Sequence, residues 1–284
     1  MKNALRESDR PPVLVVGSGL LHESGLGQIA DWIYLLEVAA NAVKTKFDRL
    51  LANEHPSLYW DTLMAEGAEN QCRSATDVEA DARKAIIALI ESGVWNSRNV
   101  VIGEQLLQCR IRSIVSLNFT IAPFTADRAK GSVCKRATDG VEIGGTTIWL
   151  PHGCVQPAIK LKLGVRAYAG TIAALDKARG LAKEEELRPG KNGRSMMTDV
   201  LNSPLVFAGC GLRDAEWSLW WMLATKRRNE ARQAACKCYF LTIDPIPAEL
   251  RRRCEMLNCV PIREACPHRL WAGLIAALAK DAAT

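Results

Sequence analysis

Two side chains in this sequence could support acid–base or hydrogen-bonding chemistry, because each follows an apolar run that reads as a strand. His152 comes directly after IWLP and is one of only four histidines in 284 residues. An imidazole titrates near neutral pH, so a histidine in this position can accept a proton from a hydroxyl group or a water molecule. Asn118 ends the run SIVSLN, and its carboxamide can hold the same kinds of group. Each residue also has a structural interpretation, as a hydrogen-bonded histidine or as an amide that satisfies local backbone groups.

Glycine-rich turns follow two other apolar runs: Gly17, Ser18 and Gly19 come after VLVV, and Gly209, Cys210 and Gly211 come after PLVFA. Glycine lets backbone N–H groups and a helix N-terminus approach a phosphate closely, although ordinary strand-to-helix turns use it too. The full Gly-x-Gly-x-x-Gly fingerprint is not present, because His22 occupies its last position. Asp244, at the end of CYFLTID, is placed either to bind a ribose hydroxyl or to form a turn before a proline.

The elements that position these residues alternate along the chain. Apolar runs predict strands near residues 13–17, 113–118, 146–150, 203–212, 238–244 and 259–262. Helical spacing of apolar residues predicts helices over 29–51, 77–93, 170–187 and 247–257, and a further helix at the C-terminus. This order predicts an α/β fold with a doubly wound, Rossmann-like, mainly parallel sheet, in which the carboxyl ends of the strands share one crevice. We expect a tail at residues 1–12 and a single domain at 13–284, with a mostly helical insertion at about 52–112.

Composition narrows the class of protein. Hydrophobic residues make up 48% of the chain and charged residues 24%, and no apolar run is long enough to cross a membrane, so we expect a soluble cytoplasmic protein. None of the ten cysteines forms a Cys-x-x-Cys pair, so the sequence predicts no metal site. The net charge of +6 suits an anionic ligand. Two arginine clusters, at 227–228 and 251–253, fall in predicted helices, where such runs are usually solvated, so a nucleic-acid partner is not expected.

Several of these stretches together resemble the SIR2-like domains of the sirtuin superfamily that belong to bacterial antiphage defence systems. The resemblance covers roughly residues 12 to 265 and rests on four motifs in the same order: VLVVGSGLLHESGLGQIADW, SIVSLNFT, TIWLPHGCV and PLVFAGCGLRDAEW. It implies NAD+ as substrate, with Asn118 and His152 as the catalytic pair. It also implies pyrophosphate contacts from Gly17, Ser18 and Gly19, and a nicotinamide contact from Asp31. Gly209 and Gly211 would complete the nucleotide site, and Asp244 would contact the adenosine ribose.

Three departures from the family pattern affect what the resemblance implies. Thr120 stands where the family has an aspartate after Asn118 and Phe119. The paired cysteines of the deacetylase zinc module are missing between His152 and Gly209, so we expect no zinc ribbon and no protein deacetylase activity. The chain ends soon after the SIR2-like region, so we also expect no attached sensor domain.

The resulting hypothesis is an NAD+ glycohydrolase that releases nicotinamide and ADP-ribose as a defence effector. Such an enzyme is toxic to its own cell unless gated, so a partner protein or a nucleotide signal is expected as its activator. The aromatic stripe Trp217, Trp220 and Trp221 is either core or a surface for self-assembly. The alternatives are a catalytically silent NAD- or nucleotide-binding sensor subunit, an NAD-dependent deacylase, and a nucleic-acid-binding module that would rest on the arginine clusters.

Overall fold

The structure is a computed structural model of the chain, and it describes residues 10–95, 101–125, 132–134, 140–155, 159–187, 195–213, 216–230 and 237–279. Within these residues, eight strands form one sheet in the order β3-β4-β5-β2-β1-β6-β7-β8. The strands are β1 (Val13–Val16), β2 (Ser113–Ser116), β3 (Ser132–Cys134), β4 (Gly140–Ile143), β5 (Thr146–Trp149), β6 (Leu205–Ala208), β7 (Cys238–Thr242) and β8 (Cys259–Arg263).

The sheet is parallel from β5 to β8, and its other edge is antiparallel. The predicted α/β class with a mainly parallel sheet is therefore confirmed. The antiparallel edge was not predicted, since the region before β5 reads as a loop. Gly144 and Gly145 form the turn between β4 and β5, and both have positive φ, as a tight hairpin turn requires.

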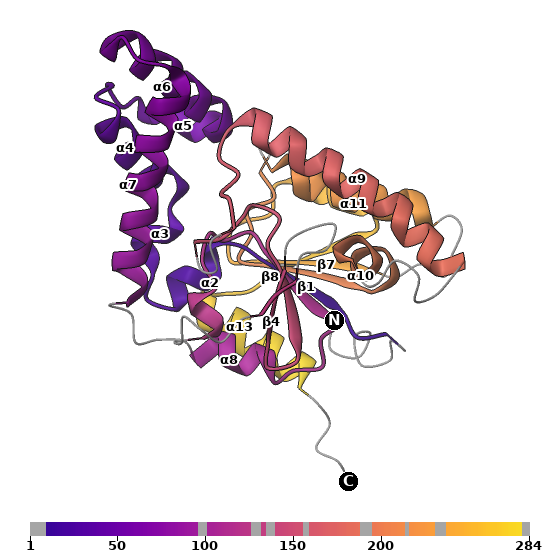
Figure 1. Cartoon of the computed structure of the whole chain (residues 1–284). Helices are drawn as coiled ribbons and strands as arrows, with labels where there is room; N and C mark the ends of the chain where they lie inside the picture. Colours follow the sequence, from indigo (N-terminus) through magenta and orange to yellow (C-terminus); the bar gives the residue numbers. More distant parts are fainter. Residues whose placement is uncertain are drawn as a thin grey trace.

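Helices cover both faces of the sheet, which explains why its strands are apolar without alternation (Figure 1). In β1, Leu14 and Val16 pack into one core cluster, while Val13 and Val15 pack into the other. The first cluster includes residues of α2 (Ser18–Glu23), α8 (Val101–Leu107) and α13 (Pro267–Leu278). The second includes residues of α9 (Val165–Leu187), α10 (Met196–Asn202), α11 (Trp217–Glu230) and α12 (Ala248–Met256). Within the described part of the chain, no helix is long and apolar enough to cross a membrane.

A helical module stands beside the sheet and has a core of its own (Figure 1). It consists of α3 (Gly27–Ala30), α4 (Trp32–Ala42), α5 (Arg49–Glu54), α6 (Pro56–Gln71) and α7 (Ala75–Trp95). Its centre contains Leu36, Trp60, Leu63 and Ile86, all almost fully buried. The module therefore begins before the predicted insertion at 52–112 and ends earlier, because α8 already packs against the sheet.

The predicted helix over residues 29–51 is wrong, because the chain breaks it twice. Asp31 ends α3 and caps α4, with its carboxylate accepting a hydrogen bond from the Ile33 N–H. Lys44 then adopts a left-handed conformation after the end of α4, and the Thr45 N–H donates back to the Ala40 carbonyl. Helices commonly end in this way at a glycine, so a lysine in that place gives no signal in the sequence.

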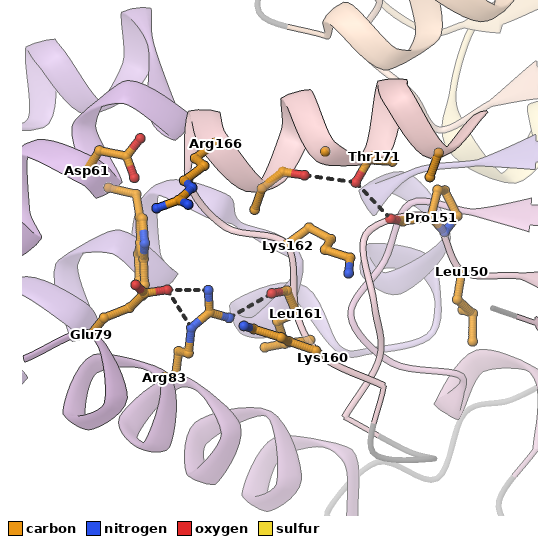
Figure 2. Close-up of a pocket in the computed structure, with 15 residues that line it drawn as sticks. Asp61, Glu79, Arg83, Leu150, Pro151, Lys160, Leu161, Lys162, Arg166 and Thr171 are labelled. Carbon is orange, nitrogen blue, oxygen red and sulfur yellow. Dashed lines mark hydrogen bonds and ion pairs between the residues drawn. The ribbon is translucent and has the colours of Figure 1, made fainter. Parts of the chain in front are cut away.

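The helical module is hydrogen-bonded to the segment that leads into α9 (Figure 2). The Arg83 side chain of α7 donates to the Leu161 carbonyl at 2.7 Å. The Asp61 carboxylate of α6 accepts from the Val165 N–H at 3.0 Å and so caps the first turn of α9. Both contacts join residues that are far apart in the sequence.

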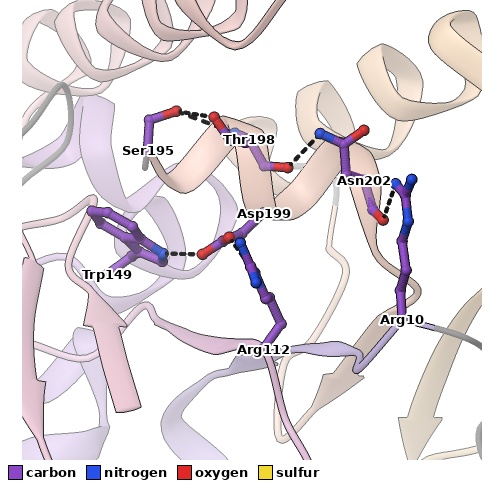
Figure 3. A network of polar contacts seen from close by, with 7 residues as sticks. All are labelled: Arg10, Arg112, Trp149, Ser195, Thr198, Asp199 and Asn202. Carbon is purple, nitrogen blue, oxygen red and sulfur yellow. Dashed lines mark hydrogen bonds and ion pairs between the residues drawn. The ribbon is translucent and has the colours of Figure 1, made fainter. Parts of the chain in front are cut away.

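A buried carboxylate ties α10 to the sheet (Figure 3). Asp199 is fully enclosed, and it accepts hydrogen bonds from the Arg112 guanidinium at 2.9 Å and from the Trp149 indole at 3.1 Å. Arg112 immediately precedes β2, and Trp149 ends β5. A buried charge with such partners is costly to leave unpaired, so the network favours one position for α10.

The C-terminal end of α10 is capped by a buried cation. The Lys226 side chain is 1% exposed, and its ammonium group donates to the carbonyls of Val200, Leu201 and Ser203. A cation at a helix C-terminus interacts favourably with the unpaired carbonyls and with the helix dipole.

Replacing Lys226 with methionine is therefore expected to lower the free energy of unfolding by about 3 kcal/mol, because three carbonyls, two of them in buried hydrogen bonds, lose their donor. Denaturant unfolding of Lys226→Met measures the change. The control is Arg228→Met, which replaces an exposed cation on the same helix and should stay within about 0.5 kcal/mol of wild type. Equal effects of the two substitutions would contradict the capping role.

Candidate functional site

The order in which the chain adds strands to the sheet reverses at β1. From β1 the chain passes to β2 and β5 on one side, then returns to place β6, β7 and β8 on the other side. In open parallel sheets, ligands bind off the carboxyl ends of the strands at such a reversal. A cavity of about 400 Å³ lies there, between the sheet and the helical module. Its volume falls within the range of small-molecule sites.

Most of the predicted site residues line this cavity: Gly17, Ser18, Asp31, Asn118, His152, Gly209 and Gly211. Two predicted residues do not. Gly19 lies against the backbone of Gly209, and Asp244 is an exposed residue in the turn after β7. The Asp244 N–H bonds to the Thr242 hydroxyl, which fits the turn-forming alternative for this residue.

His152 is buried at the cavity wall. It is 2% exposed, and its Nδ1 atom has no hydrogen-bond partner among the described residues. Its Nε2 atom lies 3.4 Å from the Ser218 hydroxyl, and its ring packs against Tyr168 with centroids 4.7 Å apart. A buried polar atom without a partner is unusual in a folded protein, so Nδ1 is a group that a ligand or water is suited to meet.

Burial determines the charge of this histidine. Desolvation lowers the pKa of His152 to about 4, so the ring is neutral at pH 7 and can accept a proton. Its backbone is held as well, because the Lys162 N–H donates to the His152 carbonyl at 2.8 Å. The following Gly153 has φ of +83°, and a Cβ there would lie 2.2 Å from the Lys160 carbonyl oxygen. The glycine after His152 is therefore required by the fold.

Asn118 links the ends of two neighbouring strands. Its amide nitrogen donates to the Gly17 carbonyl at 3.1 Å, from the end of β2 to the end of β1. This bond uses one of the two amide hydrogens, so the other hydrogen and the oxygen are the groups that a ligand can meet. The side chain therefore has a structural role in addition to its place in the cavity wall.

The two glycine turns pack backbone against backbone. A Cβ on Gly17 would lie 2.4 Å from the Gly209 oxygen, and one on Gly19 would lie 2.6 Å from the Gly209 Cα. The Gly19 N–H donates to the Gly209 carbonyl and the Gly17 N–H to the Ala208 carbonyl. Both N–H groups are thus engaged inside the protein, and exposed Ser18, at the first position of α2, is the turn residue nearest to solvent.

The outer wall of the cavity comes from the start of the helical module. Asp31 is exposed at the cavity edge, where its carboxylate caps α4. Trp32 and Phe119 pack with ring centroids 5.4 Å apart, and both line the cavity. An aromatic wall beside polar groups is typical of sites that bind flat organic rings.

Sequence reasoning missed several polar residues of this site, among them Tyr168, Arg213 and Glu216. Burial raises the pKa of the Glu216 carboxyl, and the neighbouring Arg213 opposes that shift. Burial likewise raises the pKa of the Tyr168 phenol, so this group stays protonated at neutral pH. Arg213 and Glu216 follow a glycine turn just before α11, a placement that signals a site. Tyr168 lies inside a charged helix and carries no such signal.

The tryptophan stripe of α11 is divided between core and surface. Trp220 and Trp221 are partly buried and pack against the second core cluster. Trp217 is 57% exposed. Two tryptophans of the stripe therefore pack into the core, and the third lies at the surface.

Among the described residues, no cluster of three or more histidine, cysteine, aspartate or glutamate side chains is placed to hold a metal ion. Comparison of the sequence with protein-family models and with curated proteins finds no match.

The glycine contact predicts that Gly19→Ala lowers the free energy of unfolding by about 2 kcal/mol or more, because the added methyl group meets backbone atoms. Thermal or denaturant unfolding measures the effect. The control is Gly273→Ala in α13, where nothing lies within 4 Å of an added Cβ. That variant should be slightly more stable than wild type, since alanine favours helix over glycine. A neutral Gly19→Ala would show that the two turns can separate at little cost.

The buried histidine predicts a pH dependence of stability. The folded pKa of about 4 lies below the unfolded value near 6.5, so the folded protein binds fewer protons between these values. The neutral His152 therefore contributes fully to the free energy of unfolding above pH 6.5. This contribution, about 3 kcal/mol, is lost as the pH falls from 6.5 through the folded pKa of about 4. Unfolding free energies of wild type and His152→Gln, measured from pH 7 to pH 4, should converge by this amount. Parallel curves would mean that the ring is not desolvated.

Proposed function

We propose that this chain is a SIR2-like NAD+ glycohydrolase, which cleaves NAD+ to nicotinamide and ADP-ribose. The observation that carries the proposal is the buried, neutral His152 with an unpartnered ring nitrogen, in the same cavity as Asn118. The proposal includes a doubly wound sheet of the Rossmann type without a zinc ribbon. The crevice at the reversal of the strand order supports it, because dinucleotides bind at such crevices in folds of this type.

The chemistry of NAD+ matches a site with few charged groups. When the bond between the anomeric carbon and the nicotinamide nitrogen breaks, its electron pair leaves with the nicotinamide, which departs as a neutral molecule. The leaving group therefore needs no general acid. The site must instead position the ribose, stabilise a positively charged transition state and guide a water molecule to the anomeric carbon.

His152 and Asn118 suit these tasks. A neutral imidazole can accept the proton of the attacking water as the new carbon–oxygen bond forms, or it can accept a hydrogen bond from a ribose hydroxyl. A low pKa makes it a weak base, and an oxocarbenium-like centre needs only weak assistance because it is a strong electrophile. The Asn118 carboxamide can orient the same hydroxyl or water.

The proposal assigns the remaining contacts along the cavity. Ser18 and the exposed Arg213 are best placed for the pyrophosphate, since the N–H groups of Gly17 and Gly19 are engaged within the protein. Asp31 would lie on the nicotinamide side. Asp244 could reach the adenosine ribose only if the ligand extended beyond the cavity.

As an effector of antiphage defence, the enzyme would be kept inactive until a partner protein or a nucleotide signal arrives. Trp217, the exposed member of the aromatic stripe, supports a protein contact on α11, either with such a partner or with a second copy of the chain.

A catalytically silent NAD-binding sensor is the second candidate function. Two observations favour it: the glycine N–H groups point into the protein, and Thr120 replaces an aspartate, with its hydroxyl bonded to the Ala122 N–H. This candidate predicts NAD+ binding without turnover.

The test is release of nicotinamide from NAD+, followed by chromatography, by the purified chain and in cells that carry its neighbouring genes. Wild type should release nicotinamide in at least one setting, and Asn118→Ala and His152→Ala should each slow release by about 100-fold or more. His268→Ala, which changes an exposed histidine in α13, is the matched control and should keep the wild-type rate. NAD+ bound without turnover in both settings would replace the hydrolase with the silent sensor.

A further inference from the structure

A second, larger pocket lies between the helical module and α9, and the proposed reaction does not use it (Figure 2). Its volume is about 670 Å³. Its walls come from α6, α7, the segment before α9, the first turns of α9 and the end of β5: Trp60, Asp61, Glu79, Arg83, Leu150, Pro151, Lys160, Leu161, Lys162, Gly164, Arg166, Ala167, Gly170, Thr171 and Ala174.

The carboxylates of this pocket already have partners. Glu79 forms an ion pair with Arg83, one turn away on α7. Asp61 accepts the N–H that opens α9. Its pKa is raised, mainly by burial. The two carboxylates therefore offset part, but not all, of the charge of the four cations that line the pocket.

The remaining cations have no such partners. Lys160, Lys162 and Arg166 make no side-chain hydrogen bond or ion pair with any residue that the structure describes, and Figure 2 shows their side chains entering the space between α7 and α9. The three charges come from two different walls of the pocket. They therefore define a small volume of positive potential that is bounded by protein on several sides.

We propose that this pocket binds a small molecule that carries at least two phosphate groups. One phosphate can meet the guanidinium of Arg166, whose planar donors match phosphate oxygens in pairs, while a second meets the ammonium groups of Lys160 and Lys162. A ligand with a single negative charge would leave two cations unpaired. The size of the pocket suits a nucleotide as well as an inorganic polyphosphate.

The pocket is separate from the cavity at His152, but the two share a wall. The Lys162 N–H donates to the His152 carbonyl, and the Thr171 hydroxyl contacts the Pro151 carbonyl at 3.4 Å. Tyr168 projects from the same turns of α9 toward the other cavity, where it packs on the His152 ring. A bound polyphosphate would therefore contact the residues that hold His152 from behind.

Isothermal titration calorimetry of the full chain with sodium pyrophosphate tests the proposal. We expect binding at one site per chain, and weaker binding of inorganic phosphate. Lys162→Gln and Arg166→Gln should each weaken pyrophosphate binding by about tenfold or more, since each removes a charged hydrogen-bond donor. The matched control is Lys177→Gln, which removes an exposed charge further along α9 and should change the affinity by less than about twofold.

Further titrations show which pocket binds the ligand and which part of the ligand is recognised. Arg213→Gln, which removes the cation assigned to the pyrophosphate of NAD+ in the other cavity, should bind pyrophosphate as wild type does, so this result does not depend on whether the chain hydrolyses NAD+. ADP that binds more tightly than pyrophosphate would support the proposal and identify a nucleotide as the ligand, and equal affinities would support it with the phosphates alone as the recognised group. Absent binding, equal losses in Lys162→Gln, Arg166→Gln and Lys177→Gln, or loss of binding in Arg213→Gln would each overturn it.

Discussion

The close contact between the two glycine turns is the constraint on which the site depends. β1 and β6 are neighbours in the sheet, and their carboxyl ends meet where Gly17 and Gly19 touch Gly209. Side chains in these positions would force the turns apart, and the cavity floor lies directly on them. Asn118 then joins the third strand end to the same turn through the Gly17 carbonyl. The glycines therefore serve first to bring strand ends together, and any ligand contact builds on that arrangement.

Within this arrangement, the histidine itself is uncharged, and several cations lie one wall away. Burial keeps His152 neutral, and its closest ring neighbour is an uncharged phenol. On the other side of Pro151, three cations line a larger pocket. Such a difference across one wall is possible because the His152 loop and the segment before α9 are packed closely and joined by backbone hydrogen bonds.

The sequence predicted the parts of the structure that are encoded by local patterns. Unbroken apolar runs identified the parallel strands, and the polar residues after them identified most of the cavity lining. The β3–β4 edge was not predicted because its strands are only three and four residues long, in a region rich in glycine, lysine and threonine. The break in the helix after residue 42 was not predicted because Lys44 takes a conformation that usually marks glycine. Tyr168 joins the site only through the packing of α9 onto the sheet. Asp244 shows the reverse case, a strand-end acid that the fold leaves in an ordinary turn.

The cap of α9 illustrates how far local order can depend on a distant element. The carboxylate that opens this helix belongs to Asp61, which lies in another layer of the molecule and precedes Val165 by 104 positions in the chain. A cap of this kind typically stabilises a helix by about 1 kcal/mol. The first turn of α9 would therefore be less stable in the isolated segment than in the intact protein. The first turn of α9 therefore depends on residues of both α9 and α6. If the helical module undocked, the helix would fray from the end that holds Tyr168, and the imidazole behind it would gain both room and water.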